Sequence, residues 1–334
     1  MVEYRTPPET MKDELEGLYG KLDPLYLDPG FRVTDVSIWK EPKKSLEPAH
    51  WKWSEGRNAL EEVARIVGPE HAERRNLIMR NPAEGHAYGT LRTMISAYQL
   101  MLPGETARSH WHSPHALRVI LEGGGSYTVV NGERVDMRPG DVVLTPGGDW
   151  HWHGVEGDDA CMWLDILDRP LTIALEPLFQ DYHPDGHEPM RNVAEPSPLL
   201  FSWGDTLEAL DRDEPDPDGC FGTRIELGAT KPALPTLALH MQRLPAGTIT
   251  NRFRSSANYL YLVLEGSGRS IVDGKVFDWQ RGDVVAVPCW RPVVHEAHEH
   301  AILFSASDEP VQRLCGYLRE ERGEPPPGPE VSTR

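Results

Sequence analysis

The sequence has few cysteines, no long apolar runs and a shortage of positive charge. Its four cysteines lie far apart and form no Cys-x-x-Cys pair, which is typical of reduced, mostly buried thiols in a cytoplasmic protein. No apolar stretch approaches membrane-spanning length, and residues 1–17 have no apolar core after a basic start, so we expect neither a transmembrane helix nor a signal peptide. The net charge of −18 argues against nucleic acid or an anionic membrane as a partner.

Three histidines stand out among the residues that are present. His110 and His112 lie two residues apart, and His151 follows in the segment GDWHWH. Short apolar runs, alternation and turn residues such as Asn131-Gly132 around them are typical of β-strands. Because residues i and i+2 of a strand point to the same side, a histidine from a later strand can complete a metal site with them. The His-x-His pair alone is as readily a chance pair on a polar edge, but the spacing of both segments together favours the metal site.

Both histidine segments resemble the two motifs of the cupin family. Residues 104–123 fit the first motif and residues 140–151 fit the second. Many cupins carry a Glu ligand four residues after the second His, and here that position is Ala116, so we expect three neutral imidazoles and no carboxylate. A divalent metal held in this way keeps its charge and about three open positions, enough for a bidentate organic anion and one small molecule. By ligand type, iron, copper, nickel and zinc all stay open.

A long internal repeat predicts two barrels. The segments Leu102-Pro103, Leu121–Gly123 and Gly140–Val143 return as Leu244-Pro245, Leu264–Gly266 and Gly282–Val285. A repeat of this length indicates a duplicated domain rather than a solenoid unit. We therefore predict an all-β fold, a bicupin of two jelly-roll (double-stranded β-helix) barrels with an N-terminal helical extension.

The second copy of the repeat lacks the metal ligands. Phe253, Ser255 and Val293 stand where the first copy has its three histidines. Phe and Val cannot bind a metal, so we expect the second barrel to be metal-free. His295 aligns with His153 of the first copy, so this is the histidine position that the two copies share.

The chain divides by pattern into five expected segments. Residues 11–22 and 58–68 have helical spacing, and they fall in the extension that precedes the first barrel. An Asp/Pro-rich stretch at residues 211–219 marks an exposed connection, and the Pro-rich end of the chain is expected to be disordered. The segments are the N-terminal helical extension (1–90), the first barrel with the metal site (91–175), the inter-barrel connection (176–232), the metal-free second barrel (233–320) and the disordered tail (321–334).

The chain as a whole resembles the gentisate 1,2-dioxygenases and their salicylate and 1-hydroxy-2-naphthoate relatives. The resemblance covers nearly everything outside the extreme termini and rests on five segments: AERRNLIMRNP (72–82), LPGETARSHWHSPHALRVILEG (102–123), WLDILDRPL (163–171), LPTLALHMQRL (234–244) and LFSASDEPV (303–311). It implies an enzyme that uses Fe(II) and O2 to open the ring of a 2-hydroxybenzoate between the carboxyl-bearing and hydroxyl-bearing carbons, in the degradation of aromatic compounds. It also implies a homotetramer.

Three residues are expected to act beside the metal. Arg118 follows Ala116 by two residues and so shares the inward face of its strand, where its guanidinium suits a carboxylate or an oxygen anion; a surface position is the alternative. His153 points to the same side as the ligand His151, and it orients substrate, carries a proton or only hydrogen-bonds inside the barrel. By the resemblance, Asp165 lies beside the active site, where it orients His153 or has a structural role in a turn.

The resemblance also adds pocket residues and leaves the ring substituent open. Gln99 matches a polar pocket position of the family, and Arg74 and Arg75 either bind the aromatic acid at the pocket rim or make ion pairs at a helix end. Residues 86–96 (HAYGTLRTMIS) and Trp111 between the ligands depart from the family pattern, so gentisate, salicylate and a 5-nitro- or 5-halosalicylate all remain candidates. A non-oxidative metal-dependent cupin (an isomerase or hydrolase) and a small-molecule-binding cupin remain as other classes.

Overall fold

The computed structural model describes residues 11–30, 40–68, 71, 74–86, 88–193, 196–228 and 233–323. The chain divides into two units, Met1–Lys43 and Lys44–Arg334. In the first unit, α1 (Lys12–Leu22) confirms the helix predicted over residues 11–22, and the short 3-10 helix η2 (Asp23–Leu25) follows it. None of the described helices is long and apolar enough to cross a membrane.

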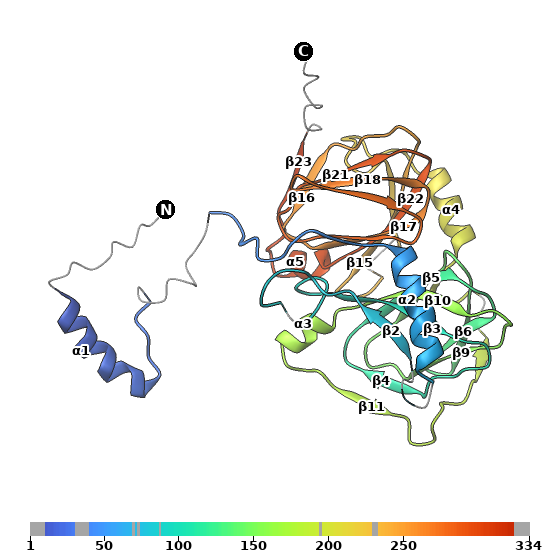
Figure 1. The fold of residues 1–334 in the computed structure, drawn as a ribbon, viewed down its shortest axis with the longest axis horizontal. Helices are drawn as coiled ribbons and strands as arrows, with labels where there is room; N and C mark the ends of the chain where they lie inside the picture. Colours follow the sequence, from blue (N-terminus) through green and yellow to red (C-terminus); the bar gives the residue numbers. More distant parts are fainter. Residues whose placement is uncertain are drawn as a thin grey trace, which may run out of the picture. The chain divides into compact units, whose positions relative to one another are not determined.

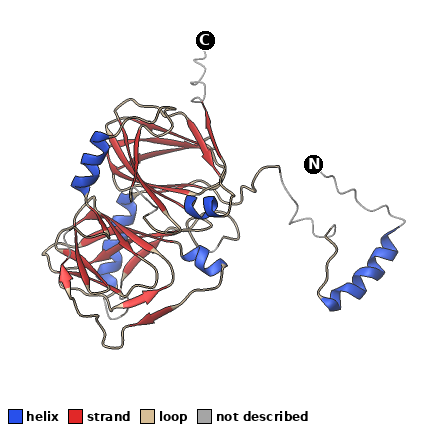
Figure 2. Ribbon diagram, turned by 180° about the vertical axis from the view of Figure 1, so that it is seen from behind, coloured by secondary structure: helices blue, strands red, loops and turns tan. Residues whose placement is uncertain are grey.

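The second unit contains two β-barrels (Figures 1 and 2). The strands of the first are β2 (Arg75–Ile78), β3 (Ile95–Met101), β4 (His110–His112), β5 (Ala116–Glu122), β6 (Ser126–Val130), β7 (Glu133–Met137), β8 (Val142–Thr145), β9 (His151–Val155), β10 (Cys161–Leu167), β11 (Gln180–Tyr182), β12 (Asn192–Val193) and β13 (Leu200–Phe201). The strands of the second are β1 (Ala49–Trp51), β14 (Thr223–Glu226), β15 (Ala238–Leu244), β16 (Arg252–Ser255), β17 (Tyr259–Glu265), β18 (Ser267–Val272), β19 (Lys275–Gln280), β20 (Val284–Val287), β21 (Val293–Ala297), β22 (Ala301–Ser307) and β23 (Glu320–Gly323). The helices of this unit are α2 (Trp53–Ile66), α3 (Arg169–Ala174), α4 (Trp203–Arg212) and α5 (Glu309–Leu314).

Each barrel consists of two facing sheets. The sheets of the first barrel have the strand orders β13-β8-β5-β10-β3-β2 and β11-β4-β9-β6-β7-β12, and those of the second have the orders β1-β20-β17-β22-β15-β14 and β19-β18-β21-β16-β23. The hairpin β6–β7 turns at Asn131 and Gly132, whose φ angles are 49° and 82°, as an Asn-Gly turn between twisted antiparallel strands requires. The predicted all-β bicupin fold is confirmed.

Strand β5 is buried on both of its faces. Leu117, Val119 and Leu121 belong to a large apolar core that also contains residues of the second barrel and of helices α2 and α4. Arg118 and Ile120 alternate with them, and both are buried as well. A strand buried on both faces has a nearly continuous apolar sequence, so the polar Arg118 within it marks a position with a specific partner.

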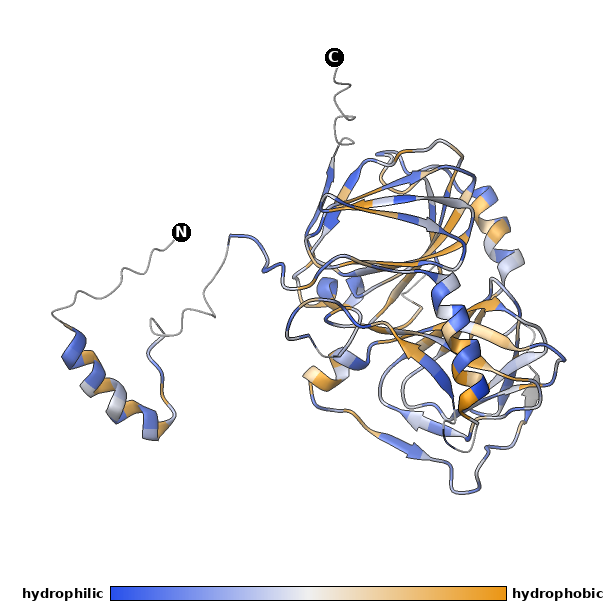
Figure 3. Cartoon of the chain, in the orientation of Figure 1, coloured by the Kyte–Doolittle hydropathy of each residue, from blue (hydrophilic) through white to orange (hydrophobic). Residues whose placement is uncertain are grey.

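Helix α2 covers the apolar core with one of its faces. It buries Trp53 and Leu60 and exposes charged residues, as the mixture of hydrophobic and hydrophilic positions along it shows (Figure 3). It confirms the helix predicted over residues 58–68, although it begins at Trp53 and ends at Ile66.

A short strand and the tryptophan after it precede each barrel and dock on the opposite barrel. Strand β1 pairs with β20 of the second barrel before the chain enters the first, and β13 pairs with β8 of the first barrel before the chain enters the second. After each strand a helix begins at a tryptophan whose backbone N–H donates to an aspartate at 2.8 Å, Trp53 to Asp283 and Trp203 to Asp141. The duplication therefore extends beyond the barrels to the strand and helix before each of them.

Two of the predicted segments contain strands that the sequence pattern did not indicate. β1 and β2 lie within the expected helical extension, and β11 to β14 lie within the expected connection. The boundaries of these segments stay predictions. The tail prediction is wrong for residues 321–323, because β23 pairs with β16 along its length, and residues 324–334 lie outside the described residues.

Candidate metal centre

The three predicted histidines meet inside the first barrel. His110 on β4 pairs directly with His151 on β9, and His112 lies two residues further along β4 on the same side. Their ring centroids are 4.3 Å (His110–His151), 4.8 Å (His112–His151) and 5.7 Å (His110–His112) apart, and one ligand atom of each lies within 4.8 Å of the others. All three side chains are buried. The predicted triad is therefore a single cluster of potential metal ligands.

Backbone carbonyls fix the tautomer of each histidine. The Nδ1–H groups of His110, His112 and His151 donate to carbonyl oxygens at 3.0, 2.8 and 2.9 Å, which leaves each Nε2 lone pair for another partner. Burial lowers the pKa of His110 to about 3 and that of His112 to about 4, and it lowers the pKa of His151 well below its ordinary value. Nε2 of His151 is buried without a hydrogen-bond partner among the described residues. Three neutral, converging lone pairs fit a divalent transition metal.

A cavity of about 130 Å³ opens beside the triad. His112 lies in its wall. The apolar lining consists of Ile78, Ile95, Ala97, Pro114, Ala116, Leu167 and Leu178. The polar lining consists of Arg74, Asn76, Tyr88, Ser96, Gln99, Arg118, Asp165, Arg169 and Gln180. Apolar walls with a few convergent polar groups are typical of a small-molecule site.

Arg118 and Asp165 form a buried ion pair in this cavity. They are directly opposed in the β10–β5 register, and their exposed fractions are 2% and 6%. Nε of Arg118 lies 3.3 Å from Oδ1 of Asp165, and Nη1 of Arg118 donates to Thr145 Oγ1 at 2.7 Å. Burial lowers the pKa of Arg118 to about 10, and burial raises the pKa of Asp165 while Arg118 lowers it. The two atoms at 3.3 Å lack hydrogen-bond geometry, so each keeps capacity for a further partner.

His153 has a different partner from the one that we considered. Its Nδ1 lies 2.8 Å from Thr128 Oγ1, which is the residue directly opposite on β6. The hypothesis that Asp165 orients His153 is therefore wrong, because Asp165 lies in the other sheet and pairs with Arg118. The ring centroid of His153 lies 5.7 Å from that of His151, and its Nε2 is buried without a partner among the described residues.

The neighbouring arginines Arg74 and Arg75 have different surroundings. Nη2 of Arg74 lies 3.3 Å from Nε2 of His110, and Arg74 lines the cavity. Arg75 is turned to other partners, since its Nη1 donates to Glu105 at 2.7 Å and its Nε donates to the Val67 carbonyl at 2.8 Å. Only Arg74 of this pair is available to a ligand in the cavity.

Other cavity residues were either predicted weakly or missed. Gln99 lines the cavity, and its Nε2 is buried without a partner among the described residues. Tyr88, Arg169 and Gln180 were not predicted as lining residues. Tyr88 lies in the segment of unusual sequence that precedes Gln99, which was the available signal. Arg169 lies two residues after the end of β10, and segments that follow strands commonly carry functional side chains.

The second barrel repeats the geometry of the first without its ligands. Phe253 on β16 pairs with Val293 on β21 at the positions of two of the histidines. Nδ1 of His295 lies 2.8 Å from Ser270 Oγ, which is the same contact that His153 makes in the first barrel. Phe253 and Val293 belong to an apolar cluster inside this barrel. These contacts support the prediction that the second barrel binds no metal.

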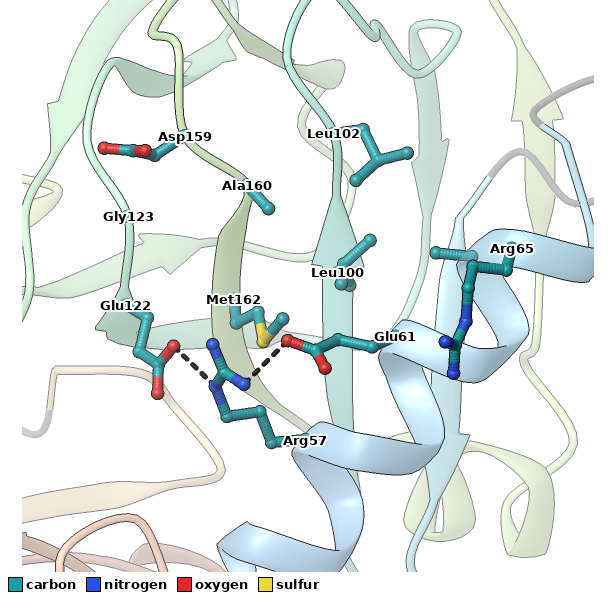
Figure 4. Close-up of a pocket in the computed structure, with 11 residues that line it drawn as sticks. Arg57, Glu61, Arg65, Leu100, Leu102, Glu122, Gly123, Asp159, Ala160 and Met162 are labelled. Atoms are coloured by element: carbon teal, nitrogen blue, oxygen red, sulfur yellow. Dashed lines mark hydrogen bonds and ion pairs between the residues drawn. The ribbon is translucent and has the colours of Figure 1, made fainter.

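A larger cavity of about 590 Å³ lies between α2 and the outer side of the first barrel (Figure 4). Arg57 crosses it and donates to Glu122 at 2.9 Å and to Glu61 at 2.6 Å, over a floor that includes Leu100 and Met162. Arg57 is paired with both of its glutamates, and the lining includes none of the potential metal-ligand groups found among the described residues. The chemistry is therefore assigned to the smaller cavity.

The fold and the site define a metal-dependent cupin with one three-histidine centre. Residues 97–167 match the Cupin domain family. Gentisate 1,2 dioxygenase 1 of Aquipseudomonas alcaligenes is 32% identical over 94% of this chain and 98% of its own. 5-Aminosalicylate 1,2-dioxygenase of Comamonas sp is 32% identical over 94% of this chain and 92% of its own. The crystal structure of salicylate 1,2-dioxygenase from Pseudoaminobacter salicylatoxidans with gentisate has a TM-score of 0.86 at 26% identity, over 96% of this chain and 97% of that one.

The chain belongs to the gentisate and salicylate 1,2-dioxygenase family of ring-cleaving bicupins. The family resemblance that the sequence indicated is thereby confirmed. The cofactor is a metal, and the three histidines are the residues that can bind it.

Proposed function

We propose that this protein is an Fe(II)-dependent dioxygenase that opens the ring of a monocyclic 2-hydroxybenzoate between C1 and C2 and incorporates both atoms of O2. The observation that carries the proposal is the triad of neutral histidines at one wall of a cavity that also contains Arg74, Arg118 and Gln99. Bound Fe(II) supplies a redox-active centre with open positions for substrate and O2. Gentisate, salicylate and 5-substituted salicylates are the candidate substrates.

Two of the cavity arginines, Arg74 and Arg118, bind the acidic end of the substrate in this proposal. Arg74 is beside Nε2 of His110, and Arg118 is held by Asp165 and Thr145, so both guanidinium groups face an anion bound at the triad. A planar guanidinium pairs with a carboxylate or phenolate through parallel hydrogen bonds.

Gln99 and His153 complete the proposed binding groups. Both carry a buried nitrogen without a partner among the described residues, and such groups favour a bound polar ligand. We assign to His153 the role of hydrogen-bonding the bound anion or carrying its proton. We assign to Asp165 the role of positioning Arg118.

The cavity volume favours a substrate with one ring. At about 130 Å³ it is comparable to an apolar protein cavity of ~150 Å³ that binds benzene, and two fused rings need more space. Ile95, Ala97, Ala116 and Leu167 offer apolar contact to the ring. This favours a benzoate over a naphthoate.

We also propose a cytoplasmic homotetramer. Leu175, Phe179 and Tyr182 are exposed large hydrophobic residues on and before β11, near Leu178 in the cavity wall. A cluster of exposed apolar side chains favours a protein interface. Sedimentation velocity of wild type and of Phe179→Ser tests the assembly: a stable wild-type monomer at micromolar concentration contradicts it.

Metal analysis provides the first test of the proposed function. Fully loaded protein should contain one iron per chain, and His112→Ala should lose it while His295→Ala, the matched histidine of the second barrel, should retain it. Two irons per chain, or normal turnover in His112→Ala, would contradict the assignment.

Oxygen consumption provides the second test. Each ring opened should consume one O2, and 18O2 should label the dicarboxylate product twice. Zinc-loaded protein should be inactive, because zinc has no accessible redox step. Full activity in the absence of oxygen would identify a non-oxidative metal-dependent cupin instead.

A further inference from the structure

Asp168 is a buried aspartate that the proposed function does not use. It follows β10 directly, is the N-cap residue of α3 and is 3% exposed. An aspartate at an N-cap commonly accepts a hydrogen bond from the first turn of its helix, but the side chain of Asp168 makes no such bond. Its Oδ1 accepts from the backbone N–H of His115 at 2.8 Å, and its Oδ2 accepts from the hydroxyl of Thr236, before β15 of the second barrel, at 2.5 Å. The carboxylate therefore joins a loop of the first barrel to the second barrel.

The peptide group between Pro114 and His115 connects this carboxylate to a metal ligand. Its N–H is the group that donates to Asp168, and its carbonyl oxygen accepts from Nδ1–H of His112 at 2.8 Å. Hydrogen bonds in a chain polarise one another, and a bond to an ionised acceptor is the stronger kind. The negative charge of Asp168 therefore makes the Pro114 carbonyl a stronger acceptor for His112.

The other two ligands are connected to neutral groups. His110 and His151 also donate from Nδ1–H to backbone carbonyls. The N–H groups of those two peptides donate to the carbonyl of Gly186 at 2.9 Å and to the side-chain amide oxygen of Asn131 at 3.1 Å, respectively. Among the described contacts of the triad, the chain that begins at His112 is thus the one that ends on a carboxylate.

The second barrel contains the same kind of aspartate without a metal ligand beside it. Asp308 is the N-cap residue of α5, and it accepts from the backbone N–H of Asn258 at 2.8 Å and from the hydroxyl of Thr93, before β3 of the first barrel, at 2.6 Å. Ser255 stands there in the place of His112. The two aspartates therefore join the barrels in both directions, and the one in the first barrel also leads to a metal ligand.

We propose that Asp168 is a positioning residue of the metal centre: through the Pro114–His115 peptide it makes His112 a stronger donor to the metal and so tightens metal binding. Thr236 holds the carboxylate in place, so the second barrel supports a metal centre whose ligands lie in the first. The inference needs a divalent metal at the triad and does not depend on the substrate. Outer partners of metal-bound histidines typically change metal affinity or activity by about 10–100-fold.

Metal affinity tests the proposal by competition with a chelator for Zn(II), and for Fe(II) without oxygen. Asp168→Asn keeps an oxygen acceptor for the His115 N–H but removes the charge, and it should weaken binding of both metals by about tenfold. Thr236→Val should fall between Asp168→Asn and wild type, and Thr236→Ser, which keeps the hydroxyl, should match wild type. Thr93→Val is the matched control, because it removes the equivalent contact to Asp308. It should lower the thermal midpoint as Thr236→Val does and leave metal affinity unchanged.

A second readout follows the hydrogen bond of the ligand itself. In zinc-loaded protein with 15N-labelled histidine, NMR separates the Nδ1–H protons, and a stronger hydrogen bond moves such a proton downfield. Asp168→Asn should move the His112 proton upfield and leave those of His110 and His151 in place.

The outcomes separate this role from a purely structural one. Unchanged metal affinity or an unmoved His112 proton in Asp168→Asn would overturn the proposal. Equal losses of metal affinity in Thr236→Val and Thr93→Val would also overturn it, since they would reflect only the lost contact between the barrels. If Asp168→Asn does not fold, the comparison of these two variants decides alone. If wild type binds neither metal, the metal centre itself is refuted, and this proposal with it.

Discussion

Removing the charge of Arg118 should cost stability as well as activity, because Asp165 depends on it. In Arg118→Met the carboxylate of Asp165, 6% exposed, loses its cation at 3.3 Å. At an effective dielectric constant of about 20, the attraction at that distance is about 5 kcal/mol. Breaking a buried pair typically costs about 3–5 kcal/mol, and we expect the free energy of unfolding to fall by that amount at pH 7. Arg118→Met/Asp165→Asn should recover all but about 1–2 kcal/mol, since no unpaired charge remains.

The same substitution should make stability depend on pH. Burial already raises the pKa of Asp165, and Arg118 is what lowers it, so Arg118→Met raises it further. The native state then holds a proton that the unfolded state loses above a pH of about 4, and the free energy of unfolding falls as pH rises, by up to about 1.4 kcal/mol per pH unit. The deficit of the variant against wild type should therefore be smaller at pH 5 than at pH 7.

Urea unfolding followed by tryptophan fluorescence measures both effects, and kcat/KM is read in parallel. Turnover should fall by about two to three orders of magnitude in Arg118→Met and stay low in the double variant, because one charged, preorganised contact is lost in both. Arg118→Lys should retain part of the turnover that Arg118→Met loses. A single variant that loses less than about 1 kcal/mol, or a double variant no more stable than the single one, would refute the reasoning.

Two further substitutions test the contacts that join the barrels. Gly282→Ala should lower the free energy of unfolding in urea by about 3 kcal/mol or more, because φ is +89° and a Cβ would lie 2.4 Å from Cγ of Trp53. The control Gly274→Ala has φ +83° and nothing within 4 Å of its Cβ, so it should cost only the backbone strain of about 1 kcal/mol. Equal losses in the two variants would contradict a role for Trp53. Thr236→Val removes a 2.5 Å hydrogen bond to the buried Asp168 and should cost about 1–3 kcal/mol by the same assay, while an unchanged midpoint would show that the contact contributes nothing.

The sequence alone predicts the metal triad and the inward position of Arg118 for a simple reason. Both depend on the two-residue period of a strand, which is local: His110 and His112 share a side, and so do Ala116 and Arg118. The turn at Asn131 and the helix α2 are local in the same way.

The partner of Asp165 could not be predicted because it depends on strand order. Strand β10 lies between β5 and β3, so Asp165 meets Arg118, while His153 lies on β9 of the facing sheet and meets Thr128. The sequence repeat aligns Leu244 with Leu102, and the strand register differs from it by one residue. Met101 pairs with Cys161 as Leu244 pairs with Ala301, so Leu244 is the structural counterpart of Met101. Side-chain partners across strands are set by topology, which local periodicity does not contain.

The exchange of short strands between the barrels could not be predicted for a related reason. β1 and β13 contain three and two residues, too few for a period, and each pairs with a strand of the barrel that is not next in the chain. Propensity and pattern act over a local window, whereas these pairings depend on tertiary contact.

The docking of β1 and Trp53 on the second barrel determines the order in which parts of the fold can form during synthesis. The partner strand of β1 begins at Val284, so these elements leave the ribosome long before the surface that they cover exists. At ~5–20 residues per second, the wait from Trp51 to Val284 is on the order of ten to fifty seconds. During that time Trp53, buried in the finished protein, lacks the Gly282 surface, and nascent chains stalled before Gly282 should be cut by protease between Ala49 and Trp53 while released full-length chains resist. The first barrel, by contrast, needs only β13, whose two residues Leu200 and Phe201 follow soon after its other strands. The half of the chain that carries the metal centre can therefore fold while the second barrel is still being translated.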